Sequence, residues 1–180
     1  IGPIGELLRP MGQLSFDEAY ALFAEQVEAG VKAGADAVFI ETMTDLYEAK
    51  AAVLAAKEHS SLPVFCTMSF EKDRRTFTGC PLSAMALTLS GLGVDGLGMN
   101  CSVGPVEMLD MAEEIQRYTD LPLIIKPNAG LPESVNGETV YNVDPEAFAE
   151  KMEAIAKLGV SYLGGCCGTT PAHIAKMIQR

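Results

Sequence analysis

One pattern repeats along the whole chain and limits its fold more than any other feature. An amphipathic helical stretch is followed by a glycine or proline and then by a short apolar run that ends in polar or small residues. The first helix illustrates it: Ser15 and Glu18 form a capping box, and apolar residues then recur at helical spacing as far as Gly34. Such alternation is typical of parallel βα units.

The pattern predicts five strands and about six helices. The strands are expected at residues 35–41, 63–69, 95–100, 122–127 and 160–165. The helices are expected to begin after Ser15, after Asp45, near Leu82, just before Met108, after Asp144 and after Thr170. Asp144 and Thr170 are each a cap residue followed directly by a proline, which favours a helix start. No low-complexity stretch, linker or shift in composition indicates a second domain.

Five parallel βα units allow two architectures, an open doubly wound sheet of the flavodoxin type or part of a (β/α)₈ TIM barrel. Both place function at the carboxyl ends of the strands. Polar or reactive residues follow all five strands, at 41–44, 69–72, 100–102, 127–130 and 165–168. An open sheet concentrates its site at one switch point, whereas a barrel uses nearly every strand end. The spread therefore favours an α/β barrel.

The net charge of the chain argues against some classes of binding partner, and its length bears on the expected fold. The formal net charge is −11, which argues against nucleic acid or an anionic membrane surface as a partner. No apolar run is long enough to span a bilayer, and the first ten residues lack the features of a signal peptide. We therefore expect a cytoplasmic protein. At 180 residues the chain is also shorter than the roughly 250 of a complete barrel.

The cysteines divide into two groups. Cys101, Cys166 and Cys167 directly follow predicted strands, whereas Cys66 lies inside one, as a small buried hydrophobic residue would, and Cys80 has no informative neighbours. Glycines around the adjacent pair let the chain leave strand geometry, so both thiols can turn toward Cys101 at a barrel mouth. A strained vicinal disulfide and two unconnected loop thiols are the alternatives.

Three thiolates with a fourth position open are the arrangement expected of catalytic rather than structural zinc. Such a site would keep an incoming substrate thiol ionised at neutral pH, although a free thiol with a pKa of about 8.5 is mostly protonated there. The three anionic ligands leave the metal little Lewis acidity. The arrangement therefore suits attack by a thiol on an electrophilic carbon better than activation of water.

These residues resemble the zinc-dependent homocysteine S-methyltransferases. The motifs that carry the resemblance are, in chain order, Gly2-Pro3-Ile4-Gly5, Ile40-Glu41-Thr42-Met43, Met99-Asn100-Cys101-Ser102, Pro127-Asn128-Ala129-Gly130 and Gly164-Gly165-Cys166-Cys167-Gly168-Thr169-Thr170-Pro171. They run in the family's order across essentially the whole chain, and the segment with double glycine and double cysteine is highly specific.

The resemblance implies a (β/α)₈ barrel in which Cys101, Cys166 and Cys167 bind Zn²⁺ and the sulfur of homocysteine completes the tetrahedron. It also implies that Glu41 contacts the amino group of the substrate and that Asn128 lies beside the zinc. A helix-capping or solvated acid is the alternative for Glu41. A structural turn residue is the alternative for Asn128.

Among the subfamilies, residues 69–105 look most like bacterial cobalamin-dependent methionine synthases. There methylcobalamin on another module supplies the methyl group, and this chain lacks the Asp-x-His-x-x-Gly signature of such a module, since neither His59 nor His173 lies in one. A betaine- or S-methylmethionine-dependent homocysteine methyltransferase is the alternative. The family's barrel has three strands before the first strand found here. Residues 1–180 are thus expected to be a homocysteine-binding barrel domain without its N-terminal strands, which could be inactive in isolation.

A hypothesis from another class is a five-stranded flavodoxin-like binding module in which the cysteines are incidental. It predicts a complete core and no tightly bound zinc. Metal content therefore separates the two hypotheses.

Overall fold

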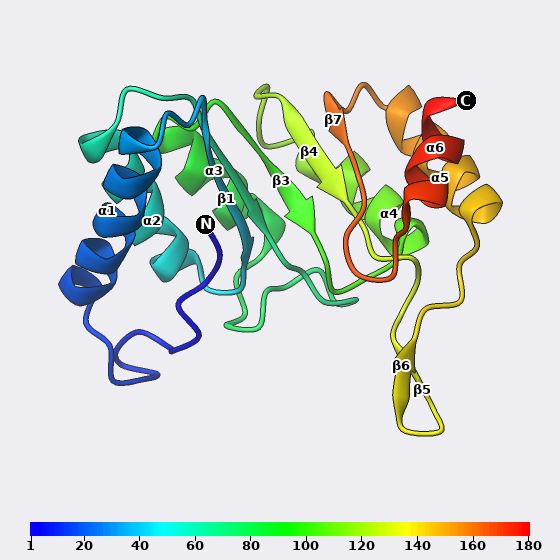
Figure 1. Cartoon of the computed structure of the whole chain (residues 1–180), viewed down its shortest axis with the longest axis horizontal. Helices are drawn as coiled ribbons and strands as arrows, with labels where there is room; N and C mark the ends of the chain where they lie inside the picture. Colours follow the sequence, from blue (N-terminus) through cyan, green and yellow to red (C-terminus); the bar gives the residue numbers. More distant parts are fainter.

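The computed structural model describes all residues, 1–180, as an α/β fold built on a five-stranded parallel sheet (Figure 1). The elements in chain order are α1 Phe16–Lys32, β1 Val38–Met43, α2 Leu46–His59, β2 Val64–Met68, α3 Leu82–Gly91, β3 Gly96–Asn100, α4 Pro105–Ile115, β4 Leu123–Lys126, β5 Glu133–Val135, β6 Glu138–Val140, α5 Pro145–Lys157, β7 Tyr162–Leu163 and α6 Pro171–Ile178.

All five predicted strands and all six predicted helices are present, with small differences at their ends. The last strand is much shorter than expected, because only Tyr162 and Leu163 pair with β4 before the chain turns away at Gly164 and Gly165. The first strand runs further than expected, to Met43, with an irregular register against β2 after Ile40.

The helix starts follow the predicted caps. Ser15 and Glu18 form the reciprocal hydrogen bonds of a capping box, and the Asp45 side chain accepts from the backbone N–H of Tyr47. Asp144 caps α5 in the same way, and proline follows both Asp144 and Thr170 at the first helical position. These local signals determine where each helix begins, and therefore where the loop between the preceding strand and that helix ends.

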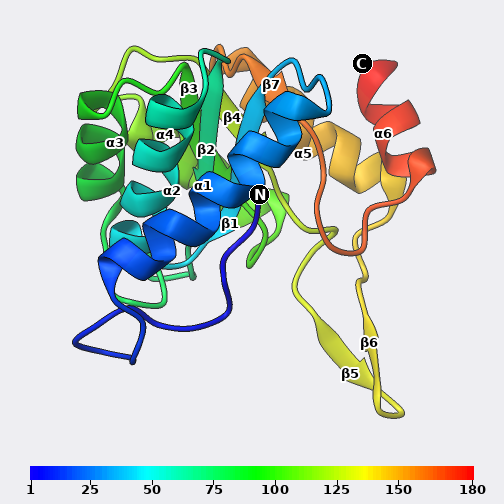
Figure 2. The same ribbon diagram turned by 60° about the vertical axis from the view of Figure 1, so that its left-hand side comes forward.

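The strand order is β1-β2-β3-β4-β7, which is the order along the chain, and every pair in this sheet is parallel. A doubly wound sheet needs a point at which the order reverses, and this sheet has none. With right-handed crossovers, a sequential order places the connecting helices on one face (Figures 1 and 2). The topology therefore matches a segment of a barrel and not a flavodoxin-type sheet.

The core lies between the sheet and these helices. Alternate strand residues such as Ile40, Cys66, Leu97 and Ile125 are buried there, as expected for Cys66. Phe148 of α5 is likewise buried, against the C-terminal part of the chain. None of the helices combines the length and apolar character needed to cross a bilayer.

The opposite face of the sheet carries an aromatic row. The rings of Phe39 and Phe65 stack at 6.0 Å, and Phe65 meets Tyr162 edge-on at 5.7 Å. These residues line a cavity of about 310 Å³ together with apolar residues of β4 and β7. Tyr162 is 49% exposed, so this face is only partly covered within the chain.

The segment between β4 and α5 contains a feature that the sequence analysis did not predict. Residues 131–143, a long connection for a βα unit, contain the antiparallel hairpin β5–β6. Asn136 and Gly137 make its turn, both with positive φ. The hairpin is exposed and extends from the body on the side toward which the strands point (Figure 1).

Candidate metal centre

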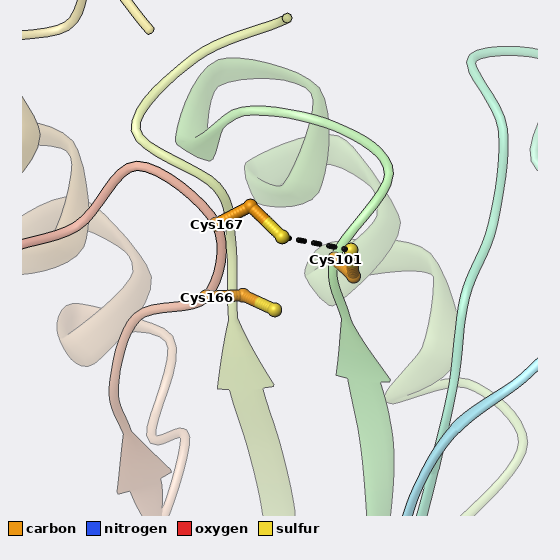
Figure 3. A group of neighbouring side chains, drawn as sticks. All are labelled: Cys101, Cys166 and Cys167. Atoms are coloured by element: carbon orange, nitrogen blue, oxygen red, sulfur yellow. Dashed lines mark hydrogen bonds between the residues drawn. The ribbon is translucent and has the colours of Figure 1, made fainter. Parts of the chain in front are cut away.

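The ends of two non-adjacent strands bring three thiols together. Cys101 directly follows β3, and Cys166 and Cys167 lie on the loop after β7 (Figure 3). Cys101 and Ser102 both adopt positive φ, 65° and 60°, so the chain turns sharply as soon as it leaves the sheet. The three side chains point toward a common space above the carboxyl ends of the strands.

The spacing of the thiols fits a tetrahedral metal ion. The Sγ atoms of Cys101 and Cys167 are 3.7 Å apart, and all three Sγ atoms lie within 4.8 Å of one another. Two thiolates bound tetrahedrally to zinc at about 2.3 Å are about 3.8 Å apart. One pair already has this separation, and no two of the Sγ atoms are more than 4.8 Å apart. The cluster thus has the donor type and the spacing for a soft metal with one position left open.

The thiols of the cluster also shift one another's pKa. The hydrogen bond from Cys101 lowers the pKa of Cys166 to about 5, and the amide of Asn100 adds to this effect. The same contact with Cys166 raises the pKa of Cys101, and burial adds to it. Cys66 is different, because burial alone raises its pKa to about 12. These opposite shifts favour Cys166 as the thiolate of the cluster.

The end of β4 holds the double-cysteine loop in place. The backbone N–H of Cys166 donates to the carbonyl of Pro127 at 2.8 Å, and that of Ala129 donates to the carbonyl of Cys167 at 2.9 Å. The Asn128 side chain adds a third contact, because its Oδ1 accepts from the backbone N–H of Cys167 at 3.0 Å. Asn128 is 2% exposed. Its side chain lies beside the cluster as expected, with its oxygen bonded to the loop backbone.

Gly168 lets the hairpin segment pack against this loop. It has φ +78°, and a Cβ atom at this position would lie 2.3 Å from Cγ of Tyr141. Burial and the neighbouring Cys167 thiol raise the pKa of Tyr141. The tyrosine therefore rests on the glycine, at the side of the thiol cluster.

Glu41 lies on the aromatic face of the sheet and has a partner that the sequence analysis did not consider. Lys126, the last residue of β4, forms an ion pair with the Glu41 carboxylate. The Lys126 ammonium also lies 4.3 Å from the centre of the Phe39 ring, a cation–π contact. The Glu41 side chain is 46% exposed. Its carboxylate is thus accessible at the strand end and already bound to one cation.

The structure brings Cys101, Cys166 and Cys167 together and places Asn128 against Cys167. The sequence analysis missed Asn100, Lys126 and Tyr141 as residues around the site. A signal existed for Asn100 and Lys126, since Asn100 is the last and Lys126 the last but one residue of a predicted strand. No local signal pointed to Tyr141, because its contact depends on how the hairpin segment folds back.

A sequentially ordered parallel α/β sheet with three free thiols above its strand ends defines a class of protein, the α/β proteins with the topology of a barrel segment and a cysteine cluster that could hold a metal ion. The particular family follows from comparison with known proteins. The whole chain, residues 1–180, matches the homocysteine S-methyltransferase family, and the protein belongs to this family.

Two known proteins, one of them solved in two forms, illustrate the relationship. A methionine synthase of Mycobacterium tuberculosis is 34% identical over 183 residues, covering 98% of this chain and 15% of that protein. The apo form of the homocysteine methyltransferase MmuM from Escherichia coli has a TM-score of 0.79 at 24% identity, covering 99% of this chain and 60% of that one. Its metallated form has a TM-score of 0.78 at 25% identity over 93% of this chain and 53% of that one. The chain thus spans a minor part of the methionine synthase.

Proposed function

We propose that this chain is the zinc- and homocysteine-binding portion of a homocysteine S-methyltransferase, which forms methionine from homocysteine. The observation that carries this proposal is the group of three thiols at tetrahedral spacing above the strand ends. Membership of the family supports it, as does the likeness to a methyltransferase that has been solved in a metallated form.

In this proposal Cys101, Cys166 and Cys167 would hold the metal. Zinc bound there would keep the homocysteine sulfur as a thiolate at neutral pH. In the reaction the thiol proton would pass to solvent, the sulfur would form a bond to the methyl carbon, and the bond between that carbon and its donor would break with its electron pair leaving on the donor. The chain's own contribution is to fix the thiols and to orient the amino acid.

Glu41 and Asn128 are the residues that we assign to the substrate. The accessible Glu41 carboxylate is a natural partner for the substrate ammonium group. In the structure Lys126 forms an ion pair with that carboxylate, so the ammonium group of the substrate would replace the ammonium group of Lys126. Asn128 would keep the Cys167 loop in position beside the bound amino acid.

We further propose that the five strands are the C-terminal portion of a (β/α)₈ barrel, in a homocysteine-binding domain to which residues 1–180 belong. Two observations support this. The backbone of Ile1 donates to Phe39 at 2.8 Å and accepts from Glu41 at 2.9 Å, the pattern of a further parallel neighbour of β1. The aromatic face with Tyr162 half-exposed also has the character of a barrel interior.

The methyl donor that we favour is methylcobalamin carried by another module. The support is the 34% identity to a methionine synthase of which this chain covers 15%. Betaine and S-methylmethionine are the alternative donors. The free thiols of the cluster need a reducing compartment, so we place the protein in the cytoplasm.

Metal and substrate binding test the proposal directly. We expect about one zinc per chain in the wild type, almost none in a Cys101, Cys166, Cys167→Ser triple variant, and full occupancy in the matched Cys66→Ser variant. Equal zinc in the triple variant and the wild type would overturn the metal centre. Isothermal titration with homocysteine should give zinc-dependent heat, whereas homoserine, which lacks the thiol, should give none. Equal heats for both ligands would refute the proposed role of the substrate sulfur.

A further inference from the structure

A buried amide lies directly beside the thiol cluster and has no part in the chemistry proposed above. We propose that Asn100, the last residue of β3, is a positioning residue that fixes Cys166 Sγ and strengthens metal binding by donating a hydrogen bond to it. Asn100 is completely buried and lies next to the thiol-bearing Cys101 in the chain. The inference rests on the proposed function only in taking Cys166 as a metal ligand.

The Asn100 side chain uses its full hydrogen-bonding capacity. Its Oδ1 accepts from the backbone N–H of Thr42 at 2.9 Å and from the Thr67 hydroxyl at 2.6 Å. Its Nδ2 donates to the Thr42 hydroxyl at 2.7 Å and to Cys166 Sγ at 3.8 Å. An asparagine amide offers two acceptor and two donor sites, so none is left unpaired.

This network determines which end of the amide faces the sulfur. A backbone N–H can only donate, so the atom opposite the Thr42 N–H must be the oxygen of Asn100, and the NH₂ group must then face Cys166. Thr42 adopts φ 64°, and its backbone N–H and its hydroxyl both bond to the same amide. A rotation of the amide would leave a buried N–H without a partner.

The contact links the sheet to the metal ligands. Thr42, Thr67 and Asn100 belong to β1, β2 and β3, so these three strands together hold the amide of Asn100 beside a sulfur from the β7 loop. Three thiolates around a divalent cation carry an excess negative charge, and an N–H donor disperses part of it. Loss of a hydrogen bond to a metal ligand typically lowers metal affinity about 10–100-fold.

The decisive variant is Asn100→Asp, measured in the whole 180-residue chain. A carboxylate can still accept from the Thr42 N–H and from both threonine hydroxyls, since the Thr42 hydroxyl can turn to donate. It has no N–H to donate to Cys166, and it adds a negative charge beside the thiols. Thr67→Val is the matched control, because it removes one bond to the same amide and leaves the N–H beside the sulfur. Asn100→Ser, too short to reach Cys166, replaces Asn100→Asp if that variant fails to fold by circular dichroism.

We expect the affinity for Zn²⁺, measured by competition with a chromophoric chelator, to fall about 10–100-fold in Asn100→Asp and less than about threefold in Thr67→Val. The sulfur-to-metal charge-transfer band of the Co²⁺-loaded protein should shift in Asn100→Asp alone. A folded Asn100 variant with the wild-type affinity would overturn the inference, and so would an equal loss in Thr67→Val. A wild type that binds no Zn²⁺ would instead refute the proposed metal centre.

Discussion

Replacing Gly168 by alanine separates two costs that the structure assigns to this position. Gly168 has φ +78°, where an L-residue is disfavoured by about 1–2 kcal/mol. The new Cβ would also lie 2.3 Å from Cγ and 2.5 Å from Cβ of Tyr141, so the base of the hairpin must move. Overpacking of this kind costs about 1–3 kcal/mol. We expect a total loss of about 3 kcal/mol in the free energy of unfolding.

Gly159→Ala is the matched control. Gly159 has a similar φ of +85°, and a Cβ atom there would meet nothing within 4 Å. It should therefore carry the backbone cost alone, about 1 kcal/mol. For a chain of this size, 1 kcal/mol corresponds to about 2–4 °C in Tm, so the expected decreases are about 6–12 °C for Gly168→Ala and 2–4 °C for Gly159→Ala.

Thermal and urea unfolding of the metal-free proteins measure the difference, and a double-mutant cycle assigns its cause. In a Tyr141→Gly background, where both the ring and its Cβ are gone, Gly168→Ala should lose only as much stability as Gly159→Ala does. Equal losses for the two alanine variants in the wild-type background would show that Tyr141 does not press on Gly168. An unchanged effect of Gly168→Ala in the Tyr141→Gly background would refute the same argument.

Three further substitutions have defined outcomes. Asn128→Ala should lower stability by about 1–3 kcal/mol in urea unfolding, because the N–H of Cys167 loses its acceptor; a change under 0.5 kcal/mol would contradict this. Phe148→Ala should cost about 3–5 kcal/mol, because the ring is fully buried, and the exposed Leu87→Ala should cost under about 0.5 kcal/mol. Burial raises the pKa of Glu48 in the folded chain, so its charged form destabilises the fold as pH rises above the ordinary value of 4.5. Glu48→Gln, which can still accept from the Ile4 N–H, should therefore gain stability relative to wild type between pH 4 and 7, and a constant difference across that range would refute the assignment.

The sequence predicted the elements well because their signals are local. The capping box at Ser15 and the proline-initiated helices at Pro145 and Pro171 depend on a few neighbouring residues, and each helix begins where those residues place it. The hairpin β5–β6 also had a local signal, the Asn136-Gly137 pair between two short β-prone runs. The prediction of strands from the sequence did not use this signal.

The sequence predicts the three thiols of the candidate site, but it predicts few of the contacts that the surrounding residues make. Three cysteines after two strand ends identify a cluster once the sheet is known to be parallel. The partners of Asn100 and Lys126 depend on the register between strands, which the sequence does not specify in this chain. The ion pair between Lys126 and Glu41 joins β4 to β1, which are not adjacent in the sheet, so it follows from the curvature of the sheet and not from any short motif.

The pairing of β7 has a consequence for hydrogen exchange. Only Tyr162 and Leu163 pair with β4, whereas β3 is buried throughout and pairs with β2 and with β4 over four residues each. The backbone amide protons of β3 should therefore exchange only when the whole chain unfolds. The backbone amide protons of β7 should exchange through local opening. Cys101 follows a fully buried strand, and Cys166 and Cys167 follow the shortest strand of this sheet. The thiol cluster thus joins two parts of the sheet that we expect to differ in the free energy of local opening.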